Sequence, residues 1–506
     1  MCGIVVIHDG TCSTDGSDEG GNDTGPRMLA RLRHRGPDSI DFRRVGRSWL
    51  GHTRLSIVDV AGGDQPISGP SGSRWVVCNG EIYNHEELRD SLPGPFVTHS
   101  DSEVALHAVE AWGPGAIGRL RGMYAFAIAD EDGGLVAARD ALGVKPLYWA
   151  RDDGRSLFAS ELGSFDPSWR RHVEEFPPGH YWTPNEGLVR FAEHTGFDIA
   201  YASREQARTA IRDTLVQSVR ARMMADVPIG VFLSGGLDSS LVAAIMARHG
   251  ADTGQRIRSF AAGVAGSSDL RAARRVADHL DLEHHERIYD ADEVLDVLPT
   301  VVRSMEAYEP SLVRSAVPNY LLAELAAEHV KVVLTGEGAD EIFAGYDYLR
   351  DYDDADELRA ELVRSVEGLH NLNLQRCDRV TMAHGLEARV PFLDRDVIAV
   401  GHRIPIGWKL PGEAGEEKRI LREAFDGWLP DDILWRCKEQ FGDGSGTATV
   451  TAELAAELVP EPDWASAGIP GLPLPRSREE LAYQRIFAEH LDGVRADRLL
   501  GRFATA

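Results

Sequence analysis

Lysine is nearly absent from this sequence. Of its 54 basic residues only five are lysines, namely Lys145, Lys331, Lys409, Lys418 and Lys438. The 80 acidic residues outnumber the basic ones and give a net charge of −26. This charge argues against non-specific nucleic-acid binding, because the phosphate backbone would repel the protein. An acidic, lysine-poor composition fits a high-salt cytoplasm and a GC-rich genome about equally well.

Cysteine is also scarce, and long apolar runs are missing. The five cysteines are scattered and form no CxxC pair, so neither a disulfide framework nor a zinc site is expected. No apolar run approaches the roughly 20 residues of a membrane span, and no basic leader with a cleavage site begins the sequence. We therefore expect a cytoplasmic protein without nucleic-acid or membrane partners.

The chain is long enough for two domains, and its two parts differ in pattern. Short β-type runs bounded by turn residues are Ile4–Ile7, Trp75–Cys78, Met123–Ala129, Leu135–Ala138, Pro146–Ala150 and Tyr181–Thr183. Helical and β-type runs then alternate at Arg204–Ala225, Pro228–Leu233, Leu241–Arg248, Ile257–Val264, Leu270–Leu280 and Lys331–Leu334. The first part is expected to form antiparallel hairpins, and the second an α/β domain with a mostly parallel sheet and flanking helices. Poor order is expected beyond about Gly446.

Cys2 is the first residue that suggests chemistry. A small residue at position 2 favours removal of Met1, which would place a free α-amine beside the thiol. An amine with a pKa near 8 can take the thiol proton, so one residue would supply nucleophile and base. Position alone is weak support, because every chain has a second residue.

Three later motifs suit the recognition of glutamine by such a thiol. Arg54 of RLSIVD can pair with the α-carboxylate in bidentate fashion. Asp101 of HSDSE can bind the α-ammonium. Asn79 and Gly80 of NGEIYN can stabilise the oxyanion that forms when the thiol attacks the amide.

Together with MCGI and HRGPD, these motifs resemble the class II glutamine amidotransferases over about residues 2–190. The resemblance implies glutaminase activity and an α+β domain over 2–195, built as a four-layer αββα sandwich of the N-terminal nucleophile type. It also implies substrate contacts from Ile57, Val58 and Glu81. Two residues of HRGPD, Arg35 and Asp38, are expected to be structural and to hold the loop behind the site.

SGGLDSS follows an apolar run and opens a helix, so glycine N–H groups and a helix N-terminus come together. Such a turn binds phosphate, and the Walker pattern of kinase-like phosphate loops is missing. The motif resembles the pyrophosphate loop of enzymes that split ATP into AMP and pyrophosphate. The residues expected around ATP or the intermediate are Leu233, Ser234, Gly235, Gly236, Asp238, Ser239, Ser240, Val264, Thr335, Gly336, Glu337, Tyr346 and Arg376.

By the same resemblance, two carboxylates are expected to carry Mg²⁺, and their positions suit this role. Asp238 lies inside the phosphate loop, where a carboxylate needs an intervening cation. Asp340 of LTGEGADE follows another apolar strand, and ligands of open α/β sheets collect at the carboxyl ends of strands. Mg²⁺ prefers carboxylate and phosphate oxygens. For Glu341, in the same motif, a structural or solvated role is expected.

GLEARVPFLD and WRCKEQFGDGSG, added to the two preceding motifs, resemble the asparagine synthetases over about residues 205–446. By this resemblance Lys438 is a catalytic lysine, whose compact ammonium can contact the α-phosphate and the leaving pyrophosphate. Lys145 is expected to be structural. One departure is that the family has an aspartate at the position of Asn373, while this chain has Asp378 further on. Either another acid is recruited, or the acceptor differs.

The resemblance implies a second domain over 204–506 and amidation of aspartate with ATP, Mg²⁺ and ammonia, which reaches it from glutamine through an internal tunnel. It implies small-molecule partners (glutamine, aspartate, ATP) and a homodimer. Two alternatives stay open: a related amidoligase for another carboxylate, of natural-product or β-lactam type, and a sensor that only binds glutamine and ATP. Intact catalytic groups in both domains argue against the sensor. The intact glutaminase motifs argue against ring closure without ammonia.

Overall fold

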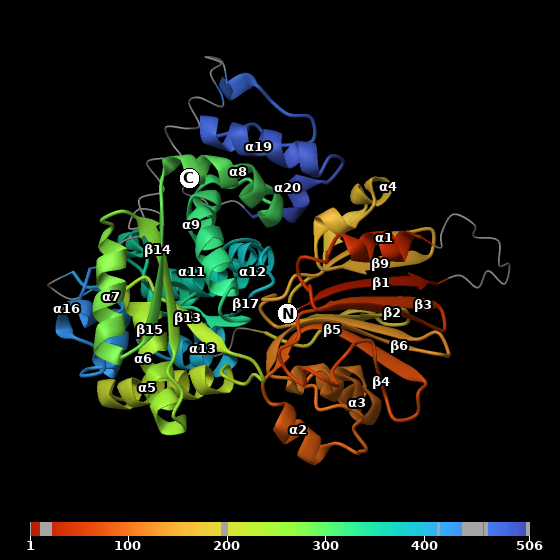
Figure 1. Ribbon diagram of the computed structural model, residues 1–506, viewed down its shortest axis with the longest axis horizontal. Coiled ribbons are helices and arrows are strands. Elements are labelled where there is room, and N and C mark those ends of the chain that lie inside the picture. The colour runs from red at the N-terminus through yellow and green to blue at the C-terminus, as the bar shows by residue number, and fades with distance from the viewer. Residues whose placement is uncertain are drawn as a thin grey trace.

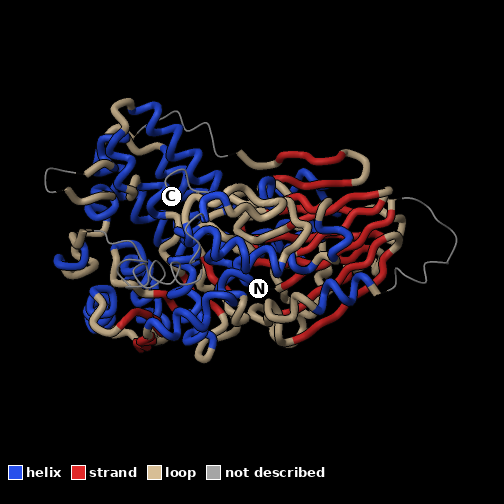
Figure 2. The backbone as a smooth tube through the Cα atoms, turned by 90° about the horizontal axis from the view of Figure 1, so that it is seen from above, coloured by secondary structure: helices blue, strands red, loops and turns tan. Residues whose placement is uncertain are grey.

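The computed structural model describes residues 2–10, 23–193, 201–411, 415–437, 459 and 464–501. Figure 1 shows two parts side by side, one rich in strands and formed by the start of the chain, the other rich in helices. Figure 2 shows the same division from above. Within the described residues, no helix combines the length and apolar character needed to cross a membrane.

Two antiparallel sheets of six strands form the first part. One has the order β10 (Val173–Glu175), β8 (Tyr148–Asp152), β9 (Arg155–Ala159), β1 (Gly3–Asp9), β3 (Ser48–Arg54) and β2 (Ser39–Val45). The other has the order β12 (Gly187–Arg190), β11 (His180–Thr183), β7 (Leu135–Arg139), β6 (Gly122–Asp130), β5 (Arg74–Ile82) and β4 (Ile67–Ser68). Helix α1 (Thr24–Ala30) packs on β1 and β3, and α3 (Glu103–Trp112) on β5, beside α2 (His85–Ser91). The expected αββα sandwich is confirmed.

Alternation along β1 places this strand between two apolar layers. Ile4 and Val6 are buried against Val77 of β5 in the opposite sheet. Val5 and Ile7 belong to a different cluster of buried side chains, which includes α1. Because successive side chains of a strand point to opposite faces, the run IVVI fills both faces at once. This fixes the register of β1, and with it the position of Cys2 at its start.

A five-stranded parallel sheet forms the second part, in the order β15 (Glu283–Tyr289), β14 (Arg258–Val264), β13 (Ile229–Phe232), β16 (Val332–Leu334) and β17 (Glu387–Arg389). The expectation of a mostly parallel sheet is confirmed. Val231 of β13 pairs with Leu334 of β16, so the two strands end together. The SGGLDSS and TGEGADE loops that follow them therefore share one edge of the sheet. Helix α6 (Leu237–Thr253) begins within the first loop and α10 (Ala339–Phe343) within the second.

Among the described residues of the second part, the other helices of eight or more residues are α5 (Arg204–Ala221), α7 (Ser268–Leu280), α8 (Ala291–Met305), α9 (Pro310–Ala327), α11 (Ala355–Gly368), α12 (Asn373–Met382), α13 (Arg395–His402) and α19 (Arg478–His490). The shorter ones are α14 (Ile406–Lys409), α15 (Arg419–Ala424), α16 (Asp431–Leu434) and α20 (Ala496–Leu499), and α4 (Pro167–Arg170) belongs to the first part. Helix α9 packs on β14 and α12 packs on β17 and α9.

The expectation of poor order beyond about Gly446 is wrong for α19. This helix packs on α8 and α9 and buries Leu481, Tyr483 and Phe487. Its Glu479 also pairs with Arg314 of α9. Composition suggested a loose tail, but apolar residues at helical spacing give α19 one buried face.

Charged side chains join the two parts. Arg121 Nη1 lies 2.6 Å from Asp396 Oδ2, and Lys331 Nζ lies 2.6 Å from Asp38 Oδ2. The contact surface between the two parts therefore includes ion pairs.

Candidate active sites

Cys2 is buried at the start of β1, with 6% of its surface exposed. Its backbone N–H donates to Asn79 Oδ1 over 3.0 Å, and its carbonyl accepts from Arg35 Nε over 3.0 Å. Burial raises the pKa of the Cys2 thiol, whereas the N-terminal charge, a hydrogen bond with the backbone of Leu55 and the guanidinium of Arg54 oppose this rise. The thiol therefore needs a base to act as a nucleophile at neutral pH.

Asn79 presents an unused donor beside Cys2. Its Oδ1 accepts from Cys2, but its Nδ2 is buried and has no hydrogen-bond partner among the described residues. A buried donor in this state is costly unless a ligand accepts from it. At the next residue, Gly80, φ is +145°, and a Cβ would collide with the carbonyl oxygen of Met123. This geometry suits an oxyanion hole and explains why a glycine follows Asn79.

Arg54 supports the RLSIVD loop. Its Nη1 donates to Asp64 Oδ1 over 2.8 Å, and its Nη2 donates to the carbonyl of Asp59 over 2.7 Å and to that of Val58 over 3.4 Å. The carbonyl of Ile57 accepts the N–H of Asp226, from the second part, over 2.9 Å. The loop is thus held from both sides. Substrate contacts of Arg54, Ile57 and Val58 stay predictions.

Two buried acids lie close to the same strand end. Asp101 Oδ2 accepts the N–H of Ile82 over 2.6 Å, and burial raises its pKa. Glu81 Oε2 lies 3.5 Å from Arg389 Nη2, and burial raises its pKa well above the usual range. A bound α-ammonium would favour the ionised form of such a carboxyl, which fits the role predicted for Asp101.

A cavity of about 740 Å³ lies at the carboxyl edge of the parallel sheet. The predicted residues that line it are Leu233, Ser234, Gly236, Asp238, Ser239, Thr335, Gly336, Glu337, Asp340, Tyr346 and Arg376. Three predicted residues do not line it: Gly235, Ser240 and Val264. Ser240 is fully buried in α6, and Gly235 packs against Ala272 at a φ of +72°. Most of the predicted nucleotide site is therefore one continuous surface.

The two motif loops touch each other within this cavity. A Cβ added to Gly336 would lie 2.8 Å from Asp238 Cβ and from the backbone N of Ser239. Ser234 Oγ and Ser239 Oγ are 3.1 Å apart. The N-terminus of the 17-residue helix α6 faces the same space, where its free N–H groups favour an anion. The site suits a polyphosphate.

Lys418 lies between the two carboxylates predicted to hold Mg²⁺. Its ammonium pairs with Asp238 and lies 2.7 Å from Asp340 Oδ1, with 1% of the residue exposed. The carboxylates therefore converge on one cation, which fits a metal bound by two carboxylates plus substrate phosphates. Within the described residues no group of three or more His, Cys, Asp or Glu suggests another metal site.

This chain has Asn373 where the family has an aspartate, and it has Asp378 further on. The positions of these two side chains show whether one acid replaces the other. Asn373 lines the cavity and donates its amide to Glu341 Oε1 and to Tyr346 Oη, each over 3.2 Å. Asp378 lies on the other side of α12 and pairs with Arg35. Asp378 therefore does not replace the missing acid in the synthetase cavity. Glu341 also lines the cavity and accepts from Tyr346 Oη over 2.6 Å, and its structural or solvated role stays a prediction.

Comparisons with known proteins agree with both half-sites. The glutamine amidotransferase domain model matches residues 1–176, and the asparagine synthase model matches residues 210–355 and 350–502. The chain belongs to the asparagine synthase family. It is 39% identical to a probable glutamine-hydrolysing asparagine synthetase of Schizosaccharomyces pombe, over 97% of this chain and 93% of that one. It is 39% identical to asparagine synthetase B of Escherichia coli, over 91% and 87% of the two chains.

Sequence reasoning missed Lys418 as a site residue of this asparagine synthase family member. The lysine is far from both acidic motifs along the chain, and only the fold brings it to them. Its rarity as a residue type could have drawn attention to it, as it did to Lys438. Lys438 itself lies outside the described residues, but the preceding Arg436 and Cys437 line the cavity. The catalytic role of Lys438 stays a prediction.

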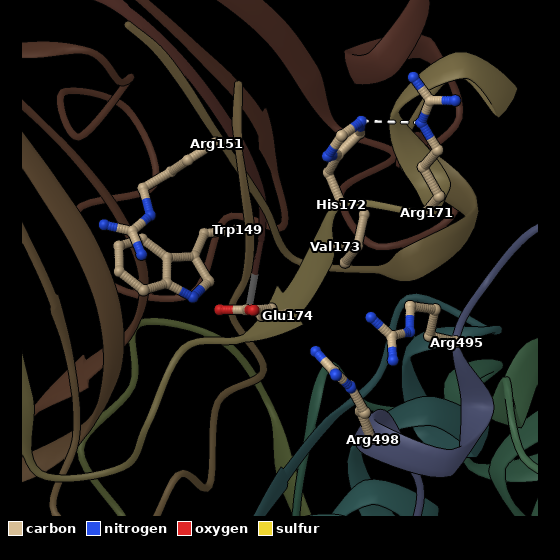
Figure 3. A pocket seen from close by; sticks show the side chains of 8 residues that line it. All are labelled: Trp149, Arg151, Arg171, His172, Val173, Glu174, Arg495 and Arg498. Carbon is tan, nitrogen blue, oxygen red and sulfur yellow. Dashed lines mark hydrogen bonds between the residues drawn. The ribbon is translucent and has the colours of Figure 1, made fainter. Parts of the chain in front are cut away.

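A second cavity, of about 280 Å³, lies away from both half-sites of this family member, between β8, β10 and α20 (Figure 3). It is lined by Trp149, Arg151, Arg171, His172, Val173, Glu174, Arg495 and Arg498. The Arg151 guanidinium stacks on Trp149 at 4.1 Å from the ring centroid. In Figure 3 the side chains of Arg495 and Arg498 reach toward Glu174. None of the predicted site residues lines this cavity.

Proposed function

We propose that this chain makes asparagine from aspartate, with glutamine as the nitrogen donor and ATP as the activating substrate. The observation that carries the proposal is that one chain holds two sites. Cys2 is buried beside Asn79, whose Nδ2 has no hydrogen-bond partner among the described residues, and the SGGLDSS and TGEGADE loops line one cavity. The first suits attack on an amide, and the second suits ATP. The glutamine-hydrolysing asparagine synthetases named above share this family.

In the glutaminase half, the Cys2 thiolate attacks the side-chain amide of glutamine. After Met1 is removed, the α-amine of Cys2 takes the thiol proton. The free N–H of Asn79 and the backbone N–H of Gly80 stabilise the oxyanion. The amide nitrogen leaves as ammonia, a thioester forms, and water then releases glutamate.

In the synthetase half, the β-carboxylate of aspartate attacks the α-phosphate of ATP, so that β-aspartyl-AMP forms and pyrophosphate leaves. The SGGLDSS loop binds the phosphates through N–H groups and the Ser234 and Ser239 hydroxyls. Asp238 and Asp340 would hold Mg²⁺, which would neutralise phosphate charge. Lys438 stabilises the leaving pyrophosphate. Ammonia, arriving through the interior, then displaces AMP.

The domain limits that we propose are 2–195 for the glutaminase and 204–506 for the synthetase. A reduced cytoplasm is supported by Cys2, Cys78 and Cys377, which are buried and free rather than paired. A homodimer stays a prediction.

The test is to incubate the purified chain with aspartate, glutamine, ATP and Mg²⁺. Asparagine, glutamate, AMP and pyrophosphate should appear in equal amounts, apart from extra glutamate from uncoupled hydrolysis. Other carboxylic acids replace aspartate in parallel reactions. Faster amidation of another acid would support a related amidoligase, and binding of both ligands without turnover would support a sensor.

A further inference from the structure

Asp378 belongs to the synthetase part but reaches the nucleophile of the glutaminase part. It lies on α12, is 4% exposed, and pairs with both terminal nitrogens of Arg35, over 2.8 Å to Nη1 and 3.2 Å to Nη2. The third nitrogen of Arg35, Nε, donates to the carbonyl of Cys2. A single guanidinium therefore joins Asp378 to the residue that attacks glutamine.

The planar guanidinium makes this link directional. Its donors form a rigid fork, so fixing one edge fixes the direction of the others. Asp378 holds one edge, and Glu161 Oε1 accepts from Nη1 over 2.8 Å. The remaining N–H then points at the Cys2 carbonyl. On the opposite side of Cys2, the backbone N–H is held by Asn79. The orientation of Cys2 is thus set from two sides, one of which depends on Asp378.

The charge of Asp378 is also needed where it lies. Arg35 is fully buried, and so is Arg379, which lies 3.1 Å from Glu161 Oε1 and 3.0 Å from Glu306 Oε2. Lys145 Nζ lies 3.8 Å from Asp378 Oδ1. Removal of one anion from such a buried cluster leaves a cation uncompensated, and the remaining groups must rearrange. Arg35 would then turn toward Glu161 and away from Cys2.

Helix α12 carries contacts to both half-sites. Arg376 lines the synthetase cavity and pairs with Glu337, whereas Asp378, two residues later, faces the glutaminase part. At about 100° per residue, positions two apart point to nearly opposite sides of a helix. The short helix is therefore a direct mechanical connection between the ATP cavity and Cys2.

We propose that Asp378 is a positioning residue for glutamine hydrolysis, supplied to the glutaminase by the synthetase domain through Arg35. The inference rests on the proposed role of Cys2. Asp378 touches neither substrate, so it acts only on the direction of the Cys2 backbone. A misplacement of about 1 Å can cost on the order of 100-fold in rate. Substrate affinity, which depends on other side chains, should change little.

The experiment compares Asp378→Asn with the wild type and with Asp396→Asn. Asp396 is a matched control, because it also pairs across the interface, with Arg121, but at the surface and away from Cys2. Glutamate release from glutamine gives kcat and KM for the first half-reaction, and asparagine formation from ammonium chloride reports on the second. For Asp378→Asn we expect a fall of about 10- to 100-fold in glutaminase kcat, a KM within about threefold, and ammonia-driven synthesis within about twofold. Asp396→Asn should change none of these.

Two results would overturn the inference. One is a glutaminase kcat of Asp378→Asn within twofold of the wild type. The other is an equal loss of ammonia-driven synthesis, which would indicate general damage to the fold. If Asp378→Asn does not fold, Arg35→Lys removes the fork but keeps the charge, and the same split is expected. A wild type that releases no glutamate would contradict the proposed function instead, so the two failures are distinguishable.

Discussion

Asn373 donates its side-chain amide to Glu341 over 3.2 Å, inside the synthetase cavity. Glu341 is fully buried next to Asp340, and its burial, together with that neighbour, raises its pKa to about 7. A neutral amide can bond Glu341 in either protonation state of the acid, whereas a carboxylate at position 373 would repel the ionised form. An asparagine at position 373, in place of the family aspartate, therefore avoids a second negative charge beside Glu341.

Asn373→Asp should destabilise the protein, and more so at pH 8 than at pH 6. Two carboxyls this close cannot both ionise, so the folded pair keeps a proton that the unfolded chain releases above about pH 4.5. The folded state then binds more protons than the unfolded state, and the free energy of unfolding falls as pH rises. We expect a loss of about 1–3 kcal/mol at pH 8 from denaturant melts. Asn373→Leu, which lacks the charge, should show a loss that does not grow between pH 6 and 8.

Cys2→Ala should abolish the use of glutamine but keep synthesis from ammonium salts. The thiol takes part only in the first half-reaction, and the ATP cavity is lined by other residues. The measurement is asparagine formation with glutamine or with ammonium chloride. Cys78→Ala is the control, because Cys78 is another buried thiol, in strand β5 of the opposite sheet. Loss of both activities in Cys2→Ala alone would contradict the separation into two half-sites.

The strands of the first part could be predicted where apolar residues formed an uninterrupted run, as in Ile4–Ile7. Strand β2, with the sequence SIDFRRV, was missed because most of its side chains are exposed and three of them are charged, so that pairing with β3 defines it. The nucleotide loops could be predicted because their chemistry is local. Lys418 and the Arg35–Asp378 pair could not, since residues 343 positions apart meet only in the fold.

Lys438→Arg should damage synthesis nearly as much as Lys438→Ala. This chain uses arginine for almost every cation, so a lysine kept in WRCKEQF indicates that size matters there beyond charge. Loss of one preorganised contact to the leaving pyrophosphate should cost on the order of 10²–10³ in rate. Pyrophosphate release with aspartate at saturating ATP is the measurement. An arginine variant within a few fold of the wild type would show that charge alone is sufficient.

Lys409 should make the stability of this protein rise with pH. Its ammonium is buried and donates to the carbonyl of Ile342 over 2.7 Å, and burial lowers its pKa to about 7. Between pH 7 and 10.5 the unfolded chain then binds more protons than the folded one, so the free energy of unfolding increases with pH. Lys409→Met should remove this increase, which we put at roughly 2–4 kcal/mol. Denaturant melts at pH 7 and 9 test this, with Lys331→Met as the control, because the ammonium of Lys331 is only partly buried and pairs with Asp38.

Lys418→Met should bind a divalent cation more tightly without nucleotide, and should lose synthesis. In the wild type the ammonium of Lys418 neutralises Asp238 and Asp340, and so competes with a metal for the same two carboxylates. The neutral methionine leaves two like charges facing one point, which a divalent cation relieves. Mn²⁺ affinity, measured by electron paramagnetic resonance without ATP, should rise by about 10-fold or more. We expect the ammonium to turn to the phosphates when Mg²⁺ and ATP bind, so its loss should also lower pyrophosphate release by on the order of 10²–10³. Lys409→Met, which removes another buried lysine, should leave Mn²⁺ affinity unchanged, and Asp340→Asn added to Lys418→Met should cancel the gain. Equal Mn²⁺ affinity in Lys418→Met and the wild type would show that the lysine does not compete for the metal site.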